Sequence, residues 1–570
     1  MPSFGVWTAL RRIITAGFDL FILCLLFIWL CGGVPFQGHL YLKHGADPRR
    51  AAILLGILGY FCYPRLREKS FILRSVNSIG LLLARPKLRW GLYALSFIYA
   101  LLLNILQTLA LRVPLWDVGI FHQIFWGIKN HLGFHSTISG AGDFLTDHFS
   151  PSIAGVVPFF YLFGESPFFL PIFQVFCLFG GCAAWIYLAE RAPGASLAFR
   201  MKLATATLIF VLSFDSLWGN LRWGFHENAL GFLCISWALT FVFVQNSHIS
   251  FYLRRYKELL ILILFLIAAF SKEILLLDVA IGLGIWAIYQ QNRYFFSRMG
   301  FASVSAGFSI ILVLKFIYFE KMPHPVGKNY FSRYYSYLGN NLETFLHTLF
   351  FAPQNIIHAV GASQLVHYFF VVFSPWLFLP LVALFNPKKA PVSVWLGMII
   401  PSFLSAALAT YSPLRDSHFH YVLELWPALA SITIVLLAQK CSPNWIWAWV
   451  LFALVRMDHD PLADLRGYWS EARQISSVRT AFRAIPLEAS VSADELVGPW
   501  LAGRKWITRW PDVALLPGQC PEYIVKNVIH EDKQFNQELQ LVLSGCQVGH
   551  PDVQASLVLK VQSWMIYRLR

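Results

Sequence analysis

The feature that most constrains this chain is a series of long apolar runs separated by short polar stretches. Several runs reach the length of about 20 residues that an α-helix needs to cross the hydrocarbon core of a bilayer. The chain of 570 residues is 57% hydrophobic and 13% charged. Soluble domains carry about 25% charged residues. The sequence therefore predicts an all-α polytopic membrane protein.

The apolar runs predict about 13 transmembrane helices. We place them at residues 13–33, 51–63, 90–111, 167–189, 203–219, 229–246, 259–270, 274–290, 300–319, 367–385, 392–410, 421–439 and 444–456. The run at 151–165 is short and contains Pro151 and Pro158, so we expect a re-entrant or interfacial piece there. We expect a break at Ser271–Glu273, because Lys272 and Glu273 would each cost about 3 kcal/mol inside hydrocarbon.

The basic residues predict the orientation of the chain. We interpret the run after Arg11 and Arg12 as a retained first helix and not as a cleaved signal peptide. With a cytoplasmic N-terminus, the inside loops are the richer in Lys and Arg, and residues 64–89 alone hold seven. The net charge of +15 is thus spread over short loops, which argues against a nucleic-acid partner.

The region from Met457 onward has a different composition. Short alternating stretches at 489–493, 504–510 and 522–528 predict strands of a small α/β domain outside the membrane. Cys520 and Cys546 lie in this region and form the only cysteine pair that we consider for a disulfide. No cysteine spacing is typical of a zinc site.

The chain divides into three parts on this interpretation. Residues 1–89 hold two extra helices and a basic cytoplasmic loop. Residues 90–456 form the main membrane module, with external loops at 112–166 and 320–366. Residues 457–570 form the external α/β domain.

The unusual polar clusters all fall at the external side of the predicted topology. They are Asp117; Asp143, Asp147 and His148; Asp215; Arg222, His226 and Glu227; Lys272 and Glu273; and Arg415, Asp416, His418 and His420. Ionisable residues retained near a membrane indicate a functional site. Their common side is the main functional signal in the sequence.

The stretch "WDVGIFHQIFWGIKN" (116–130) predicts a helix in the plane of the membrane interface. Its apolar residues recur at helical spacing at Ile120, Phe121, Ile124, Phe125 and Ile128. Asp117 stands at the helix start, where the helix dipole favours a carboxylate. From position alone, Asp117 is either a catalytic residue or a simple N-cap.

The other clusters also allow two interpretations. Asp143, Asp147 and His148 offer ligands for a divalent cation such as Mg²⁺ or Mn²⁺, or they cap a loop before a proline. His226 and Glu227 belong to a site or to a solvated loop. Arg415 binds phosphate or anchors a lipid headgroup.

Five stretches carry a resemblance to a known family. They are "WDVGIFHQIFWG", "DHFSPSIAGVVPFFYLF", "GFHENAL", "SKE" and "HFHYVLELWPALA", followed by a match in the C-terminal region. In this order they resemble a family of bacterial polytopic membrane proteins of unknown function that is grouped with the GT-C glycosyltransferase superfold. The resemblance covers about residues 90–530. Two positions depart from it, because His122 and Asn527 stand where acids are expected.

The resemblance implies an enzyme that inverts the sugar it transfers from a polyprenyl-phosphate donor. Asp117 takes the position of the acid that accepts the proton of the acceptor hydroxyl or orients it. Asp143, Asp147 and His148 would hold the acceptor or a metal, and Arg222, Lys272 and Arg415 would bind the donor phosphate. The supporting polar residues would be His122, Gln123, His226, Glu227, Glu273, His418 and His420.

Two other functions remain open at this point. One is a transporter or flippase for a lipid-linked glycan, which would place polar residues at mid-membrane depth. The other is a non-catalytic membrane protein that binds glycans or assists their assembly. The resemblance implies a bacterial inner-membrane location, with the external domain in the periplasm.

Overall fold

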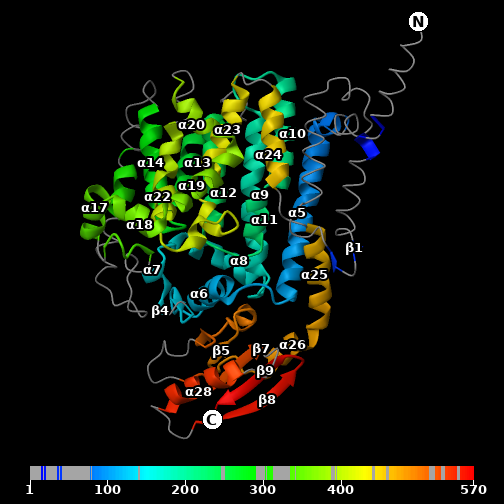
Figure 1. Ribbon diagram of the computed structural model, residues 1–570, viewed down its shortest axis with the longest axis vertical. Coiled ribbons are helices and arrows are strands. Elements are labelled where there is room, and N and C mark those ends of the chain that lie inside the picture. Colours follow the sequence, from blue (N-terminus) through cyan, green and yellow to red (C-terminus); the bar gives the residue numbers. More distant parts are fainter. Residues whose placement is uncertain are drawn as a thin grey trace.

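Figure 1 shows the computed structural model of the protein. It describes residues 15–16, 18–20, 35–36, 39–40, 78, 80–138, 142–244, 251–289, 302, 304–311, 334–339, 342–386, 392, 394–439, 443–456, 461–511, 520–527, 533–547 and 553–569. The predicted helix at 51–63 and most of the one at 13–33 lie outside these residues. The short strands β1 (Pro35–Phe36) and β2 (His39–Leu40) pair with each other.

The upper part of the molecule is a bundle of helices (Figure 1). Its longer members are α5 (Pro86–Leu109), α9 (Phe169–Glu190), α10 (Leu197–Ser213), α12 (Asn228–Phe243), α13 (Phe251–Ala269), α14 (Glu273–Tyr289), α23 (Trp426–Ala438) and α24 (Pro443–Arg456). Helix α9 lies in the middle of the bundle and packs against α5, α10, α12 and α23. Their apolar faces form one continuous core, so the bundle buries its helices against one another.

Several predicted spans are broken helices in the structure. The broken segments are α10 with α11 (Asp215–Leu221); α19 (Ala362–Phe373), η4 (Ser374–Trp376) and α20 (Leu379–Leu384); and η5 (Val394–Ile399) with α22 (Ile400–Leu408). Pro375, Pro380 and Pro401 stand at the starts of the later pieces, because proline lacks the N–H that a helix interior needs. The helices α17 (Leu342–Phe351) and α18 (Gln354–Val360) precede α19.

Length and composition make two described helices, α5 and α9, able to cross a membrane. The bent pairs α10 with α11 and α18 with residues 362–376 raise this number to four. The count of 13 spans and their orientation therefore stay predictions.

The predicted break at Ser271–Glu273 is present. Helix α13 ends at Ala269 and α14 begins at Glu273. The short run after Pro151 is also no full span, since it forms η2 (Pro151–Val156) and α8 (Val157–Leu162). It packs at the break, where the Ser152 backbone N–H donates to the Phe270 carbonyl at 3.0 Å.

A layer of short elements, the interlayer, lies between the bundle and the C-terminal region (Figure 1). It contains η1 (Leu115–Gly119), α6 (Ile120–Lys129), β3 (His135–Ser136), β4 (Gly142–Asp143) and α7 (Phe144–Asp147), besides η2 and α8. The prediction that α6 lies in the plane of the membrane interface stays a prediction. The stripe is covered by protein, because it packs with Phe144, Phe160 and residues of the C-terminal region in one core.

The C-terminal region contains a five-stranded sheet in the order β6-β5-β7-β9-β8. The strands are β5 (Val491–Ala493), β6 (Ile507–Arg509), β7 (Tyr523–Asn527), β8 (Ala555–Val561) and β9 (Trp564–Leu569). Strand β5 runs parallel to β6 and β7, and β9 runs antiparallel to β7 and β8. The three predicted strands are confirmed, whereas β8 and β9 were not predicted.

The two faces of this sheet face different neighbours. Tyr523 and Val525 of β7 join the core of the interlayer, while Ile524 faces α28 (Lys533–Gln547), as the alternation of strand side chains requires. Cys520 and Cys546 form a disulfide that links the start of β7 to α28. The helices α25 (Pro461–Gln474), α26 (Ser476–Ala481) and η8 (Phe482–Ala484) lead into the sheet, and α25 packs against α5.

Candidate functional site

Four segments that are distant in the sequence meet at the end of the bundle that faces the interlayer. They are η1 with Asp117, the loop before α12 with His226, the break before α14 with Lys272, and the loop that contains η6 (Ser412–Arg415) and η7 (His420–Val422). Gly224 allows two of them to approach closely. A Cβ on Gly224 would lie 2.5 Å from Val118, next to Asp117, and the φ of Gly224 is +80°.

Asp117, His226 and His420 form the centre of this site. One carboxylate oxygen and one nitrogen from each imidazole lie within 4.8 Å of one another. The two imidazole rings stack with centroids 3.4 Å apart. Because a pair of stacked imidazolium ions would repel, this geometry favours neutral rings.

The ring of His226 is oriented by its neighbours. Its Nδ1 lies 2.6 Å from Oε2 of Glu227 and also contacts the side-chain oxygen of Asn228. Its backbone N–H donates to Gln174 at 2.7 Å. These contacts involve Nδ1 and the backbone, so Nε2 of His226 is available to groups other than Glu227 and Asn228.

His420 has a different environment. Its side chain is 3% exposed, and neither ring nitrogen has a hydrogen-bond partner among the described residues. Burial lowers the pKa of this imidazole well below its usual value. The backbone carbonyl of His420 accepts a hydrogen bond from Asn228 at 3.0 Å, which holds the loop to the start of α12.

Asp117 is not an N-cap. The N-cap of η1 is Pro114, and Asp117 lies within the first turn. Glu495 holds this turn, since its carboxylate accepts from the Trp116 N–H at 2.9 Å and its carbonyl accepts from the Leu115 N–H at 2.7 Å. Burial, and then the negative charges of Glu495 and Glu227, raise the pKa of Asp117 to about 8. The carboxylate therefore lies where a nearby positive charge would be strongly favourable.

A small cavity adjoins this centre. Its volume is about 30 Å³, and its polar lining includes His148, Lys272, Glu273, Ser402 and Glu424. Such a volume holds about two water molecules. Lys272 pairs with Glu424 at 2.9 Å, and His148 pairs with Glu273 at 3.0 Å.

Carboxylates outnumber cations around this site. Asp117, Glu227, Glu273, Asp278 and Glu424 gather from four segments, because Glu273 and Asp278 both belong to α14. Among the described side chains here, Lys272 is the one permanent cation. The site is therefore suited to attract a further positive charge.

His418 lies two residues from His420 but belongs to a separate group. Its Nε2 contacts Asp215, and its Nδ1 lies 2.9 Å from Asp416. These two hydrogen bonds raise the pKa of His418 to about 9. The side chain is 41% exposed.

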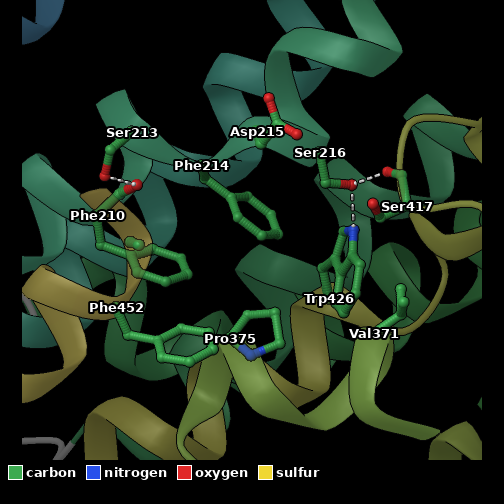
Figure 2. Close-up of a pocket in the computed structure, with 11 residues that line it drawn as sticks. Phe210, Ser213, Phe214, Asp215, Ser216, Val371, Pro375, Ser417, Trp426 and Phe452 are labelled. Atoms are coloured by element: carbon green, nitrogen blue, oxygen red, sulfur yellow. Dashed lines mark hydrogen bonds between the residues drawn. The ribbon is translucent and has the colours of Figure 1, made fainter. Parts of the chain in front are cut away.

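Figure 2 shows the contacts of Ser417, which belongs to the loop that carries His418 and His420. Ser216 of α11 donates to the Ser417 carbonyl and accepts from the Trp426 indole N–H at 2.9 Å. Beside them lies a second cavity of about 30 Å³ with an apolar lining that includes Phe210, Phe214 and Pro375. Because its polar side chains Ser213, Asp215 and Ser216 already have hydrogen-bond partners within the protein, we interpret this cavity as part of the scaffold.

Several residues predicted for the site lie elsewhere. Arg222 pairs with Asp464 of α25 at 2.8 Å, so it binds the C-terminal region. Arg415 is buried and donates to the Ala409 carbonyl. Asp143 is exposed and caps α7 through the Leu145 N–H at 3.0 Å, and the side chain of Asp147 lies outside the described part of the chain.

His122 and Gln123 of α6 have a structural role. Gln123 donates to Thr137 at 2.9 Å and to the Arg504 carbonyl at 3.2 Å, which attaches the interlayer to the C-terminal region. His122 is buried beside Phe160. Burial lowers the pKa of His122 to about 4.

Sequence reasoning missed five residues of the site: Asn228, Asp278, Ser402, Glu424 and Glu495. Asp278 and Glu424 stand alone in strongly apolar runs, where an acid is costly, and this signal could have revealed them. Ser402 connects the two, because its hydroxyl lies 2.9 Å from Glu424 and contacts Asp278. The sequence contains no comparable signal for Asn228 or Glu495.

The similarity to known proteins lies at the level of a family and of distant structures. No curated protein matches the chain. The fold is similar to ArnT from Cupriavidus metallidurans bound to undecaprenyl phosphate, with 12% identity, a TM-score of 0.47, and coverage of 83% of this chain and 97% of that chain. For the apo state of ArnT the identity is 12%, the TM-score is 0.46, and the coverage is 84% of this chain and 98% of that chain.

The family match covers most of the chain. Residues 108–544 match a family described as predicted membrane protein, DUF2079. This confirms the predicted resemblance to membrane proteins of unknown function. The chain belongs to the DUF2079 family of predicted membrane proteins.

Proposed function

We propose that this protein is a GT-C-type membrane glycosyltransferase that moves a sugar from a polyprenyl-phosphate donor to an acceptor hydroxyl with inversion. The observation that carries this proposal is the convergence of Asp117 with Lys272, His226 and His420 at one end of the bundle. His226, Lys272 and His420 are buried and the adjoining cavity is about 30 Å³ in volume, so the proposal requires this end of the bundle to open to the lipid-linked donor and to the polar acceptor.

Asp117 is the residue that we assign to the acceptor. In the transfer, the acceptor oxygen forms a bond to the anomeric carbon of the sugar while the bond from that carbon to the lipid phosphate breaks. The phosphate leaves with the bonding electron pair. Asp117 takes the proton of the acceptor hydroxyl or orients the hydroxyl for attack.

Lys272 is the residue that we assign to the donor phosphate. Its ammonium lines the cavity and lies 4.8 Å from the centre of the Tyr421 ring. Negative charge develops on the leaving phosphate, and a fixed cation next to that oxygen lowers the barrier. Arg222 and Arg415 are not assigned to the phosphate, because their contacts lie with Asp464 and Ala409.

We propose that this is a bacterial inner-membrane protein with a cytoplasmic N-terminus. Its site and its C-terminal region would both lie in the periplasm. The contacts of η1 with Glu495 support a common side for the site and this region, since Glu495 lies three residues before the start of α27 (Gly498–Leu501).

The test uses the full chain in liposomes that contain polyprenyl-phosphate sugars and candidate acceptors. Transfer is measured by mass spectrometry of the products. Asp117→Asn should lower the rate about 10²–10⁴-fold, the range of general acid–base contributions. Glu471→Gln is the matched control, because Glu471 pairs with Arg112 on an exposed surface. Transfer that survives Asp117→Asn defeats the assigned role, and no transfer with any donor favours a binding or transport function.

A further inference from the structure

We infer that Asp117, His226 and His420 form a binding site for one divalent transition-metal ion of the zinc class. The three side chains come from η1, the loop before α12 and η7. The inference goes beyond the proposed function, because metal binding requires neither a sugar donor nor an acceptor.

His420 supplies the first argument. It is a buried polar side chain whose two ring nitrogens both lack a hydrogen-bond partner among the described residues. A buried polar group without a partner costs about 1–3 kcal/mol, so such groups in folded proteins have a specific reason. One of these nitrogens lies within 4.8 Å of an Asp117 oxygen and a His226 nitrogen, where a shared cation would satisfy it.

His226 supplies the second argument. Metal-binding histidines generally donate the other ring N–H to a carboxylate or carbonyl oxygen, which fixes the tautomer. The Nδ1 of His226 lies against Glu227 and Asn228 in this way. The Nε2 lone pair is then available for a ligand.

The charge around the group supplies the third argument. Glu227, Glu273, Asp278 and Glu424 lie near the centre together with Asp117, and two basic side chains pair with them, Lys272 with Glu424 and His148 with Glu273. A divalent cation would offset this excess of negative charge. An anion bound at the same place without a cation would increase it.

The ligand set selects the type of ion. Two imidazole nitrogens and one carboxylate are typical of catalytic zinc sites, which keep a fourth position open. Mg²⁺ prefers oxygen ligands, and Mn²⁺ binds nitrogen sites more weakly than Zn²⁺ does. The sequence predicted Mg²⁺ or Mn²⁺ at Asp143, Asp147 and His148. The inferred site differs in both its residues and its ion.

The ligand atoms are near the required geometry. Zinc–ligand distances of about 2.0–2.2 Å in a tetrahedron place ligand atoms about 3.3 Å apart. The observed limit of 4.8 Å requires a contraction of about 1.5 Å. It also requires the rings of His226 and His420, which stack at an interplanar angle of 16°, to rotate apart so that one nitrogen of each ring points to the ion. If the proposed function holds, a bound ion supplies positive charge beside the acceptor, and Asp117 then orients the hydroxyl instead of taking its proton.

The test measures metal binding without any substrate. The purified full chain in detergent is stripped with a chelator, dialysed, and titrated with Zn²⁺ against a competing indicator. Its metal content is then measured by mass spectrometry. We expect one Zn²⁺ per chain, and we expect millimolar Mg²⁺ not to displace it. Loading with Co²⁺ should give the visible absorption of a tetrahedral nitrogen–oxygen site.

Three variants decide the assignment. His226→Gln and His420→Gln should each weaken Zn²⁺ binding more than about 100-fold, because even the outer partners of metal ligands contribute 10–100-fold. His418→Gln is the matched control in the same loop and should bind Zn²⁺ within about threefold of the wild type. Size exclusion and thermal unfolding check that each variant is folded.

Two results would overturn the inference: a wild-type chain that binds no Zn²⁺ at micromolar concentration, or equal binding by the His420→Gln and His418→Gln variants. The proposed function fails separately. One Zn²⁺ per chain without sugar transfer supports the metal site and counts against the glycosyltransferase. Transfer at the wild-type rate by a chain that binds no Zn²⁺ supports the enzyme and defeats the metal site.

Discussion

Two histidines in one loop have opposite surroundings. His418 is 41% exposed and has a carboxylate at each ring nitrogen. His420 is 3% exposed, and its ring nitrogens have no partner among the described residues. Hydrogen bonding within the protein accounts for His418, whereas His420 is positioned for a group that the protein itself does not provide. The comparison separates a residue that stabilises the loop from a residue that serves a site.

The largest expected effect is on the rate of sugar transfer when each of the two histidines is replaced in turn by Gln. His420→Gln should lower the transfer rate more than about 100-fold where transfer uses the inferred Zn²⁺, because it removes a ligand of that ion. His418→Gln should leave the rate within about threefold, since its contacts lie with Asp215 and Asp416. The measurement is product formation in liposomes at saturating donor. Equal losses in both variants would show that the loop as a whole is required, and would remove the distinction.

Much of the fold could be predicted from hydropathy. The helix positions, the break near Lys272 and three strands follow from local patterns of apolar and polar residues. These signals depend on neighbours in the sequence, so they do not show which segments meet. The assignment of Arg222 to phosphate had this weakness, because its partner Asp464 is 242 positions away.

The site itself could be predicted only in part. Asp117, His226 and His420 stand out individually as polar residues beside apolar runs, but their convergence depends on tertiary packing. Glu424 and Asp278 were missed because the apolar runs around them dominated the pattern. Both charges are accommodated by Lys272 and Ser402, which come from other segments.

A third histidine sharpens the comparison through pH. Burial lowers the pKa of His122 to about 4, so its neutral form is favoured in the folded protein. The unfolded chain takes up this proton near pH 6.5. The stability from His122 is therefore present above pH 6.5 and is lost as pH falls towards 4, by at most about 3 kcal/mol.

Thermal unfolding of the wild type and of His122→Gln between pH 7 and pH 4 measures this effect. Other groups titrate in both proteins, so the difference between the two isolates His122. We expect the wild type to lose more stability than the variant over this range. A difference that does not change with pH would contradict the burial of a neutral imidazole.

A smaller effect concerns the residue that holds Asp117. The Glu495 carboxylate accepts the Trp116 N–H, and a misplacement of about 1 Å can cost about 100-fold in rate. We expect Glu495→Ala to lower kcat about 10-fold with little change in KM. Glu495→Gln keeps an acceptor oxygen and should recover most of the rate. If Gln and Ala behave alike, the charge of Glu495 matters more than its position.

The smallest expected effect is on the stability that His418 provides. A partly exposed ion pair contributes about 1 kcal/mol or less, so His418→Gln should lower the free energy of unfolding by this amount. Asp215 and Asp416 raise the pKa of His418 to about 9, above the usual 6.5. The contribution is then complete below pH 6.5 and disappears as pH rises through 9, opposite in sign to that of His122. Unfolding of the metal-free wild type and variant at pH 6 and pH 9.5 tests this, and a difference that grows with pH would show that His418 is not held as a cation.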